Sequence, residues 1–196
     1  MPKKVVIDCD PGIDDAVAIA LAPGSPALEV LGLTTVAGNV GLDRTTDNAL
    51  RLTEYFGRRE VPVVPGAAVP LVRPPRLARD VHGESGLGNA RLPEAMGEPA
   101  RTHAVDFLID TFGSAPGEIS LVAIGPLTNI ALAVRREPRL VDWVREFVVM
   151  GGSYTRGNTT PAAEFNMFAD PEGAAVALGA GWRPVLIGLD LTFQTQ

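Results

Sequence analysis

Short, uninterrupted apolar segments recur along this chain, and they constrain its fold more than any other feature of the sequence. Each is rich in Val, Ile and Leu and lies close to a glycine or proline; the segments are residues 5–9, 30–36, 61–64, 119–124, 147–150 and 184–189. Because their apolar character is continuous and does not alternate, they are typical of strands buried on both faces.

The segments between these runs carry apolar residues at helical spacing. Two examples are Ala49, Leu52 and Phe56, and Val105, Leu108 and Phe112, which in a helix would share one face. Strand followed by helix, about five times over, predicts an α/β fold of the Rossmann-like kind, a mostly parallel sheet flanked by helices. We expect one domain over residues 1–196, with a long, proline-rich loop at residues 66–100, of a kind that is usually functional or mobile.

Charge and cysteine content restrict the partners and the location. The net charge of −6 and a pI near 4.9 argue against nucleic-acid or anionic-membrane partners, so Arg73, Arg76 and Arg79 are expected in solvent or anchoring loops. The single cysteine, Cys9, cannot form an internal disulfide, and no signal-peptide pattern precedes the first strand. The longest apolar run near the N-terminus, residues 16–22, is far shorter than the roughly 20 residues that span a bilayer. These features predict a cytoplasmic protein.

Polar or glycine-containing turns follow several of the predicted strands. Asp10 follows the first strand and Asn39 the second, while Ile124 ends the fourth and Met150 the fifth. Parallel sheets bind ligands beyond the carboxyl ends of their strands. The sequence therefore predicts a ligand site on one rim of the sheet.

Four carboxylates lie within eight residues at the first of these turns: Asp8, Asp10, Asp14 and Asp15. Like charges a few ångströms apart repel by roughly 1 to 4 kcal/mol per pair, so such a cluster requires a cation or protons. Helix-dipole complementarity accounts for one aspartate in a first helical turn but poorly for four carboxylates. Oxygen donors without histidine or thiolate favour calcium or magnesium. A carboxylate beside a metal-bound water can take its proton, which is hydrolytic chemistry.

A second polar cluster lies at residues 157–172. Asn158, Glu164 and Asn166 offer donors and acceptors that suit a polyhydroxylated ligand, although loop formation and helix capping are an alternative interpretation. For Asp170, which precedes Pro171, capping is the better interpretation.

Five motifs, in order along nearly the whole chain, resemble the inosine-uridine preferring nucleoside hydrolases. They are DCDPGIDDA at 8–16, AGN at 37–39, HG at 82–83, GPLTNIA at 125–131, and AEFN at 163–166 with DPE at 170–172. The resemblance implies the nucleoside hydrolase fold. It also implies a glycosidase of nucleoside catabolism and purine salvage, which hydrolyses the N-glycosidic bond of ribonucleosides to free base and ribose.

The same resemblance implies roles for individual residues. Ca²⁺ would be bound by Asp10, Asp15 and the backbone carbonyl of Ile124, and Asp10 would be the base that activates a calcium-bound water. Substrate contacts would come from Asp14, Asn39, His82, Met150, Asn158, Glu164 and Asn166, with His82 near the base. Asp8 would support the cluster from behind. The implied partners are a small ribonucleoside and further copies of the chain, in a homodimer or homotetramer.

The sequence also departs from the family. Its members continue beyond the strand that ends this chain, and many have a histidine where Phe193 stands. We therefore expect a C-terminally truncated domain that lacks one metal-binding aspartate, part of the base pocket and the leaving-group acid. The activity of the short chain is accordingly left open, with a non-catalytic ribose- or nucleoside-binding protein or assembly partner as the alternative.

A phosphatase of the haloacid dehalogenase type is a further alternative. An apolar strand that ends in Asp8-Cys9-Asp10 resembles the nucleophile motif of those enzymes. They also use a lysine, however, and this chain has only Lys3 and Lys4, which precede the strand.

Overall fold

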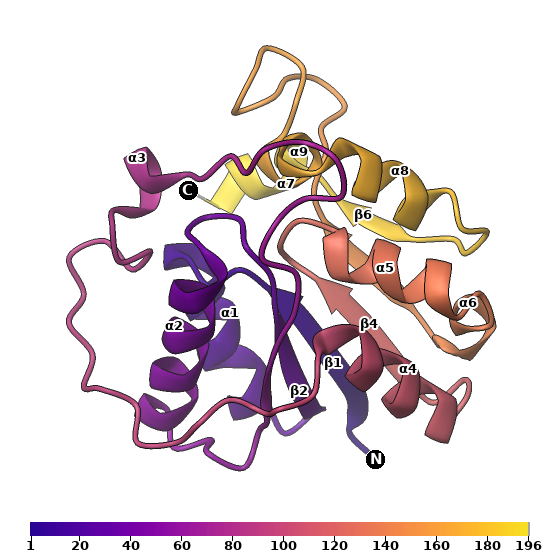
Figure 1. The fold of residues 1–196 in the computed structure, drawn as a ribbon, viewed down its shortest axis with the longest axis horizontal. Helices are drawn as coiled ribbons and strands as arrows, with labels where there is room; N and C mark the ends of the chain where they lie inside the picture. The colour runs from indigo at the N-terminus through magenta and orange to yellow at the C-terminus, as the bar shows by residue number, and fades with distance from the viewer. Residues whose placement is uncertain (196) are drawn as a thin grey trace.

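The computed structural model describes residues 1–195, which form a parallel sheet of six strands in the order β3-β2-β1-β4-β5-β6 (Figure 1). The strands are β1 (Lys3–Cys9), β2 (Leu28–Thr35), β3 (Val63–Pro65), β4 (Ile119–Ala123), β5 (Phe147–Met150) and β6 (Val185–Ile187). Each pair of neighbours runs parallel. All six predicted strands are therefore present, with ends shifted by a few residues at most.

Helices connect the strands. They are α1 (Ile13–Gly24), α2 (Leu42–Tyr55), α3 (Arg79–His82), α4 (Ala104–Ser114), α5 (Thr128–Arg136), α6 (Leu140–Trp143), α7 (Phe165–Ala169), α8 (Pro171–Leu178) and α9 (Leu189–Thr192), followed by the 3₁₀ turn η1 (Phe193–Thr195). From β1, the chain adds β2 and β3 on one side and β4, β5 and β6 on the other. Because crossovers between parallel strands are right-handed, α1 and α2 cover one face of the sheet and α5 and α8 cover the other. Within residues 1–195, no helix is long and apolar enough to cross a membrane.

Two apolar cores separate along these faces. One packs α4 and α5 against the sheet around Leu108, Phe112 and Ile130, and the other packs α1 and α2 around Ile19 and Leu52. The two apolar triplets predicted at helical spacing contribute to these cores: Val105, Leu108 and Phe112 lie in the first core, and Ala49 and Leu52 lie in the second. Phe56 is the exception, because α2 ends at Tyr55 and leaves the Phe56 side chain 39% exposed.

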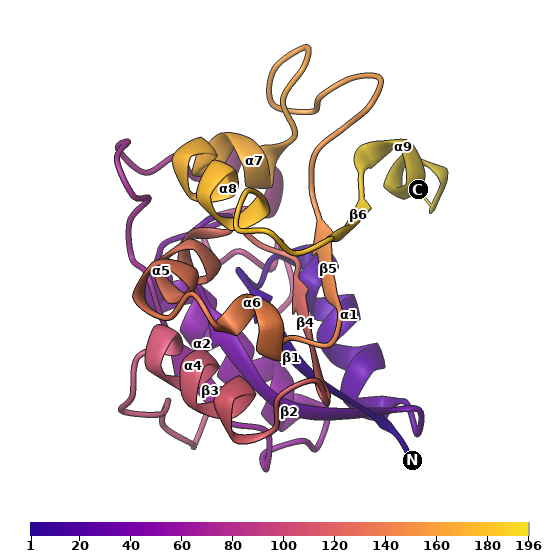
Figure 2. The same ribbon diagram turned by 90° about the vertical axis from the view of Figure 1, so that its right-hand side faces the viewer.

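Strand β6 differs from the prediction. It was expected to be buried on both faces, but Val185 and Leu186 are each 52% exposed. The reason is position: β6 is the edge strand of the described sheet, beside α9 (Figure 2). On α1, the side chains of Val17 and Leu21 are exposed as well.

The proline-rich stretch forms a long irregular connection between β3 and α4, interrupted by the short helix α3. From α3 it passes along the outside of α2 and returns to α4 (Figure 1). This confirms the prediction of a long loop, and α3 carries one candidate site residue, His82.

Candidate active site

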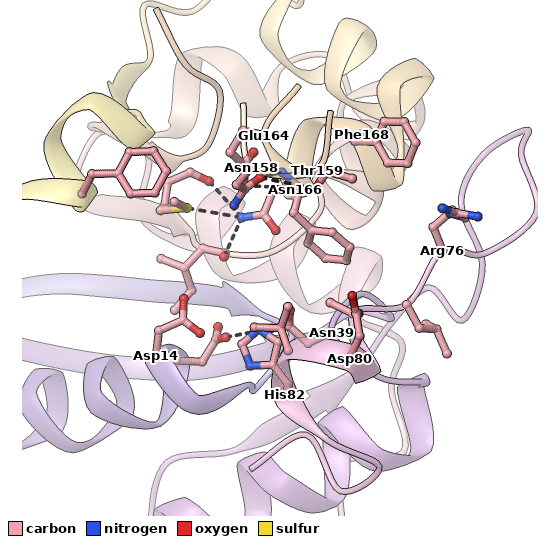
Figure 3. Close-up of a pocket in the computed structure, with 18 residues that line it drawn as sticks. Asp14, Asn39, Arg76, Asp80, His82, Asn158, Thr159, Glu164, Asn166 and Phe168 are labelled. Carbon is pink, nitrogen blue, oxygen red and sulfur yellow. Dashed lines mark hydrogen bonds between the residues drawn. The ribbon is translucent and has the colours of Figure 1, made fainter. Parts of the chain in front are cut away.

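A cavity of about 440 Å³ opens at the carboxyl ends of the strands (Figure 3). The turns after β1, β2, β4 and β5 meet there, as the sequence predicted. Its wall includes nine of the ten candidate residues, which are Asp14, Asp15, Asn39, His82, Ile124, Met150, Asn158, Glu164 and Asn166. The tenth, Asp10, is fully buried beside the cavity and does not line it.

Asp8 lies one pleat behind Asp10 and is held by the neighbouring strands. Its Oδ2 accepts hydrogen bonds from Thr34 Oγ1 at 2.5 Å and Asn129 Nδ2 at 2.8 Å. Complete burial raises the pKa of Asp8 to about 7, although both donors lower it. Asn129, in the GPLTNIA motif, was not assigned a role from the sequence, yet it also accepts from Ala67 N and so ties three segments together.

Asp10 is enclosed by backbone. Its Oδ2 accepts a hydrogen bond from the Asn39 amide at 2.7 Å, and a Cβ at Gly38 or Gly125 would overlap the carboxylate. Burial raises the pKa of Asp10 well above its usual range. The negative charge of Asp15 adds to this, and the Asn39 amide opposes it. The two glycines therefore make the room in which this carboxylate lies.

Asp15 lies in the first turn of α1 with its side chain directed back toward the β1–α1 turn. Its Oδ2 accepts from Gly12 N at 3.0 Å and Asn39 Nδ2 at 3.3 Å. Burial, and after it the charge of Asp14, raises the pKa of Asp15 to about 7. Asn39 thus contacts both predicted metal-binding carboxylates.

The second carboxylate oxygen of Asp8, Asp10 and Asp15 provides a test of whether a cation fits. Asp8 Oδ1, Asp10 Oδ1 and Asp15 Oδ1 are buried and have no hydrogen-bond partner within residues 1–195. Buried carboxylate oxygens without a partner are costly unless a proton or cation compensates them. Over the same residues, no three His, Cys, Asp or Glu side chains form a ready metal site. The predicted ligands, two carboxylates and the Ile124 carbonyl, are all oxygen donors, the kind that a hard cation prefers.

The opposite wall is built by the start of α7. Glu164 caps this helix by accepting from Asn166 N and Met167 N, and it also accepts from Gly152 N at 3.0 Å. Burial raises the pKa of Glu164 against these three donors. Its carboxylate is therefore fixed in the cavity wall, so Glu164 both caps a helix and faces the cavity.

The two asparagines of this wall also join segments. Asn166 Nδ2 donates to Ile124 O at 2.9 Å and Met150 O at 3.1 Å, across the ends of β4 and β5. Asn158 Oδ1 accepts from Phe165 N at 2.9 Å. Asn158 and Asn166 thus make structural hydrogen bonds and also line the cavity. The two interpretations left open by the sequence, loop formation and ligand contact, are therefore compatible.

His82 lines the cavity beside the start of α1. Its Nδ1 accepts a hydrogen bond from Ile13 N at 3.1 Å. A Cβ at Gly12 would lie 2.5 Å from Asn39 Nδ2 and 2.6 Å from His82 Nδ1. Glycine at this position thus lets Asn39 and His82 approach the same turn from two sides.

Sequence reasoning missed several wall residues, notably Arg76, Asp80 and Phe168. The Arg76 guanidinium lies over the Phe168 ring, 5.9 Å from its centroid. Arg76 was expected in solvent or anchoring a loop, and it lines the cavity because residues 74–78 pass over the rim. Phe168 could have been inferred from its place in the same short helix as Asn166.

The structure also confirms three expectations for polar residues outside the cavity, Asp170, Arg73 and Arg79. Asp170 caps α8 by accepting from Gly173 N at 2.9 Å. Arg73 pairs with Glu172, and Arg79 with Glu84. Lys3 and Lys4 pair with Glu146 and Glu118 at the start of β1, the end away from the cavity. A lysine is therefore not close to Asp8, contrary to what the phosphatase alternative requires.

A helix-flanked parallel sheet with a polar cavity beyond its carboxyl edge is the architecture of an α/β protein that binds a small molecule. The family model for inosine-uridine preferring nucleoside hydrolases matches residues 5–196. The chain belongs to this family. Membership confirms the resemblance seen in the motifs and decides against the phosphatase alternative.

Similar proteins agree with this assignment. The chain is 50% identical to the inosine-uridine preferring nucleoside hydrolase of Leishmania major, over 99% of this chain and 62% of the relative. It is 46% identical to the pyrimidine-specific ribonucleoside hydrolase RihB of Escherichia coli, over 98% of this chain and 61% of the relative. The chain thus spans about three fifths of their length, in agreement with the expectation that part of the family's length has no counterpart here.

Solved structures confirm the fold. The plant nucleoside hydrolase PpNRh1 superimposes with a TM-score of 0.95 at 44% identity, covering 99% of this chain and 62% of that one. The purine-preferring ribonucleoside hydrolase from Gardnerella vaginalis gives 0.94 at 34% identity, covering 98% and 62%.

Proposed function

We propose that the protein hydrolyses the N-glycosidic bond of ribonucleosides to free base and ribose, with Asp10 as the catalytic base and Ca²⁺ as cofactor. Family membership supports the reaction class. The observation that carries the site assignment is the pair of buried, unpartnered oxygens, Asp10 Oδ1 and Asp15 Oδ1, beside a polar cavity. The pKa values of both carboxyl groups are raised, and Asn39 donates hydrogen bonds to both. A divalent cation bound here would stabilise their charged forms.

The ligands in this proposal are the side chains of Asp10 and Asp15 and the carbonyl of Ile124. All are oxygen donors, which Ca²⁺ prefers, and nucleoside hydrolases are metal-dependent enzymes. When bound, the ion supplies orientation to the sugar diol and lowers the pKa of a water.

The chain's own groups carry the remaining chemistry. The Asp10 carboxylate takes a proton from water, the water oxygen bonds to C1′, and the C1′–N bond breaks with its electron pair leaving on the base. The base takes up a proton from solvent, and Asp10 returns its proton to solvent after the step. Positive charge develops on the ribose, and the nearby carboxylates of Asp14 and Glu164 stabilise it more than they stabilise the neutral substrate.

Recognition of the substrate divides between sugar and base. The ribose hydroxyls would be held by residues on two facing walls of the cavity, namely Asp14, Asn39, Asn158, Glu164, Asn166 and the Met150 backbone. His82 would lie near the base, and it lines the same cavity beside Asn39 and the start of α1. Holding the sugar in place reduces the entropy that must be lost in the transition state.

Assembly and location complete the proposal. A homodimer or homotetramer is supported by the exposed apolar side chains of Val17, Leu21 and Leu186. A role in nucleoside catabolism, including purine salvage, is supported by family membership. A cytoplasmic location is supported by Cys9, which is a buried free thiol.

Ribose release tests the activity. Inosine and uridine are incubated with the chain in Ca²⁺ or in a chelator, and reducing sugar is measured. We expect release only with Ca²⁺, and a loss of roughly 10²-fold or more in Asp10→Asn, as for removal of a general base. Asp142→Asn, an exposed change on α6, is the matched control. No release by the folded, calcium-loaded chain would contradict the activity.

Binding without turnover, by the chain alone or as an assembly partner, is the second candidate function. It is favoured by the position of Asp10, which is fully buried while Asp14, Asn39 and Glu164 line the cavity. Calorimetric titration with ribose in Ca²⁺ distinguishes the two functions. Heat of binding without sugar release from nucleosides supports the second.

A further inference from the structure

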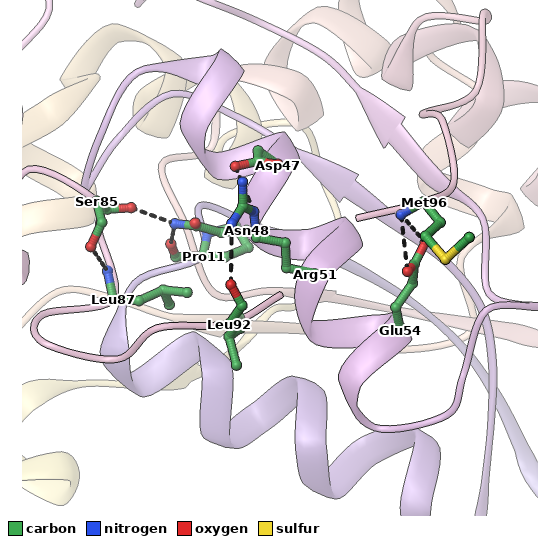
Figure 4. A network of polar contacts seen from close by, with 9 residues as sticks. All are labelled: Pro11, Asp47, Asn48, Arg51, Glu54, Ser85, Leu87, Leu92 and Met96. Carbon is green, nitrogen blue, oxygen red and sulfur yellow. Dashed lines mark hydrogen bonds and ion pairs between the residues drawn. The ribbon is translucent and has the colours of Figure 1, made fainter. Parts of the chain in front are cut away.

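One face of α2 holds the long segment 83–97 in place (Figure 4). Asn48, Arg51 and Glu54 are three residues apart and so lie along one side of the helix. Asn48 Nδ2 donates to Ser85 O at 2.8 Å, and Arg51 Nη1 donates to Leu92 O at 3.3 Å. Glu54 accepts from the amides of Met96 and Gly97. The three side chains thus anchor successive parts of one segment.

Asn48 differs from the other two because it also contacts the carboxylate turn. Its Nδ2 donates to Pro11 O at 3.1 Å, between Asp10 and Gly12. The flanking residues of this turn are held from within the site, since Asp10 O accepts from Asn39 Nδ2 and Gly12 N donates to Asp15 Oδ2. Asn48 therefore supplies the middle hydrogen bond from outside the carboxylate cluster.

The other acceptor of Asn48 belongs to the small loop that follows His82. Gly88 N donates to His82 O at 2.8 Å and Gly86 N to Gly83 O at 3.2 Å, so Ser85 and His82 lie in one closed loop. Gly86 has φ +86°, and a Cβ there would lie 2.8 Å from Asn48 Nδ2. Glycine at this position allows the loop backbone to approach the Asn48 amide.

We propose that Asn48 is a positioning residue, which fixes the spacing between the carboxylate turn 10–12 and the loop that carries His82. The proposal rests on the proposed function, in which these two segments bind the cation and the base. Both amide hydrogens of Asn48 are used, and the side chain is only 4% exposed. Its loss leaves two carbonyls without this donor where water has little access, which costs more than the hydrogen bonds are worth.

The predicted consequence is coupled loosening of two segments far apart in sequence. A change at Asn48 removes the hydrogen bond to Pro11 O, so the turn and the adjoining Asp10 carboxylate can move. It also frees Ser85 O, and with it the loop of His82. A change at Arg51 or Glu54 frees only the distant part of segment 83–97, which makes these two residues matched controls on the same helix face.

Hydrogen–deuterium exchange of the whole chain measures this coupling. We expect Asn48→Leu, which keeps the approximate volume without donors, to speed exchange about tenfold in both residues 10–16 and 82–88. Arg51→Met and Glu54→Gln should speed exchange only in residues 89–97. If Asn48→Leu does not fold, Asn48→Ala, which removes both donors without adding a charge, replaces it. Parental exchange at 10–16 in the folded Asn48 variant would overturn the proposal.

Calcium affinity separates positioning from a purely structural role. Titration with Ca²⁺ should show binding weakened about tenfold in the Asn48 variant and less than twofold in the Arg51 and Glu54 variants. Equal weakening in all three would overturn the proposal. If the parent chain itself binds no Ca²⁺, the proposed function fails, while the exchange comparison still decides whether Asn48 couples the two segments.

Discussion

The two sides of the cavity are built differently. On the β1–β2 side, Asp10, Asp15 and Asn39 are at most 6% exposed and are joined by hydrogen bonds between side chains and backbone. On the β5–β6 side, residues 153–163 form a loop whose Tyr154 side chain is 96% exposed. The first side is preorganised by burial, whereas the second depends on a few exposed contacts.

One half-buried carboxylate anchors much of the second side. Asp190, in the first turn of α9, accepts from Tyr154 N at 2.7 Å and Thr155 N at 3.1 Å. The Arg156 guanidinium lies 4.7 Å from the centroid of the Phe193 ring. These contacts join the loop to the edge of the described sheet. We conclude that substitutions on the buried β1–β2 side should have large effects, whereas substitutions in the loop of the β5–β6 side should have small ones.

The largest effect is expected from overpacking the β1–β2 side. Gly38→Ala places a Cβ against the Asp10 carboxylate and Pro126, so backbone or side chain must shift. Overpacking of this kind costs about 1 to 3 kcal/mol of the free energy of unfolding. Calcium binding should be lost as well, because Asp10 is displaced.

Gly24→Ala, at the end of α1, is the control for this change, because a Cβ there meets nothing within 4 Å. Urea unfolding and calcium titration compare the two variants. If Gly38→Ala keeps the parental calcium affinity, the Asp10 carboxylate is not confined as the structure shows.

A second prediction concerns pH. Asp8 and Asp15 have pKa values of about 7 in the folded chain, against a usual value of 3.8. Between these values the folded state keeps protons that the unfolded state has lost. The free energy of unfolding of the metal-free protein should therefore fall as pH rises from about 4 to 7. Glu137, whose pKa is lowered to about 2, acts in the opposite sense, at lower pH.

Calcium should reverse this trend, because a cation favours the charged carboxylates. Urea unfolding in chelator at pH 5.5 and 7.5, repeated with Ca²⁺, measures both effects. We expect added Ca²⁺ to stabilise more at pH 7.5 than at pH 5.5. In Asp15→Asn the pH dependence should become shallower; an unchanged slope would argue against a raised pKa at Asp15.

An intermediate effect is expected at the start of α7, in the wall opposite the β1–β2 side. Glu164→Gln removes a charge that faces the cavity and weakens the cap of α7, at about 1 kcal/mol for a capping contact. Ribose or nucleoside affinity should fall several-fold while calcium affinity stays within twofold. Calorimetry with each ligand checks this, and loss of calcium binding in this variant would contradict the division between the two sides.

The smallest effect is expected on the β5–β6 side. Asp190→Asn weakens an anchor of residues 153–163 near the surface, so global stability should change by less than about 1 kcal/mol. Trypsin should cleave faster after Arg156, and ribose affinity should fall modestly. Asp142→Asn serves as the control. Cleavage at the parental rate would show that Asp190 does not restrain the loop.

The sequence predicted the strands, the common rim and the carboxylate turn because these depend on local pattern and on the geometry of parallel sheets. Contacts between distant segments were not predictable in the same way. Asn129 reaches Asp8 across 121 positions in sequence, and Asn48 reaches Pro11 across 37. The exposure of β6 depends on which strand lies at the edge, and the apolar run at residues 184–189 does not reveal that.

The central claim is that Asp10 and Asp15 together bind a calcium ion, and calorimetric titration tests it most directly. Ca²⁺ is added to the chelator-treated chain and to its Asp10→Asn and Asp15→Asn variants, with Asp142→Asn as the control. We predict one site in the parent and in the control, and binding at least tenfold weaker in each of the other two variants. Parental affinity in both Asp10→Asn and Asp15→Asn would contradict the account.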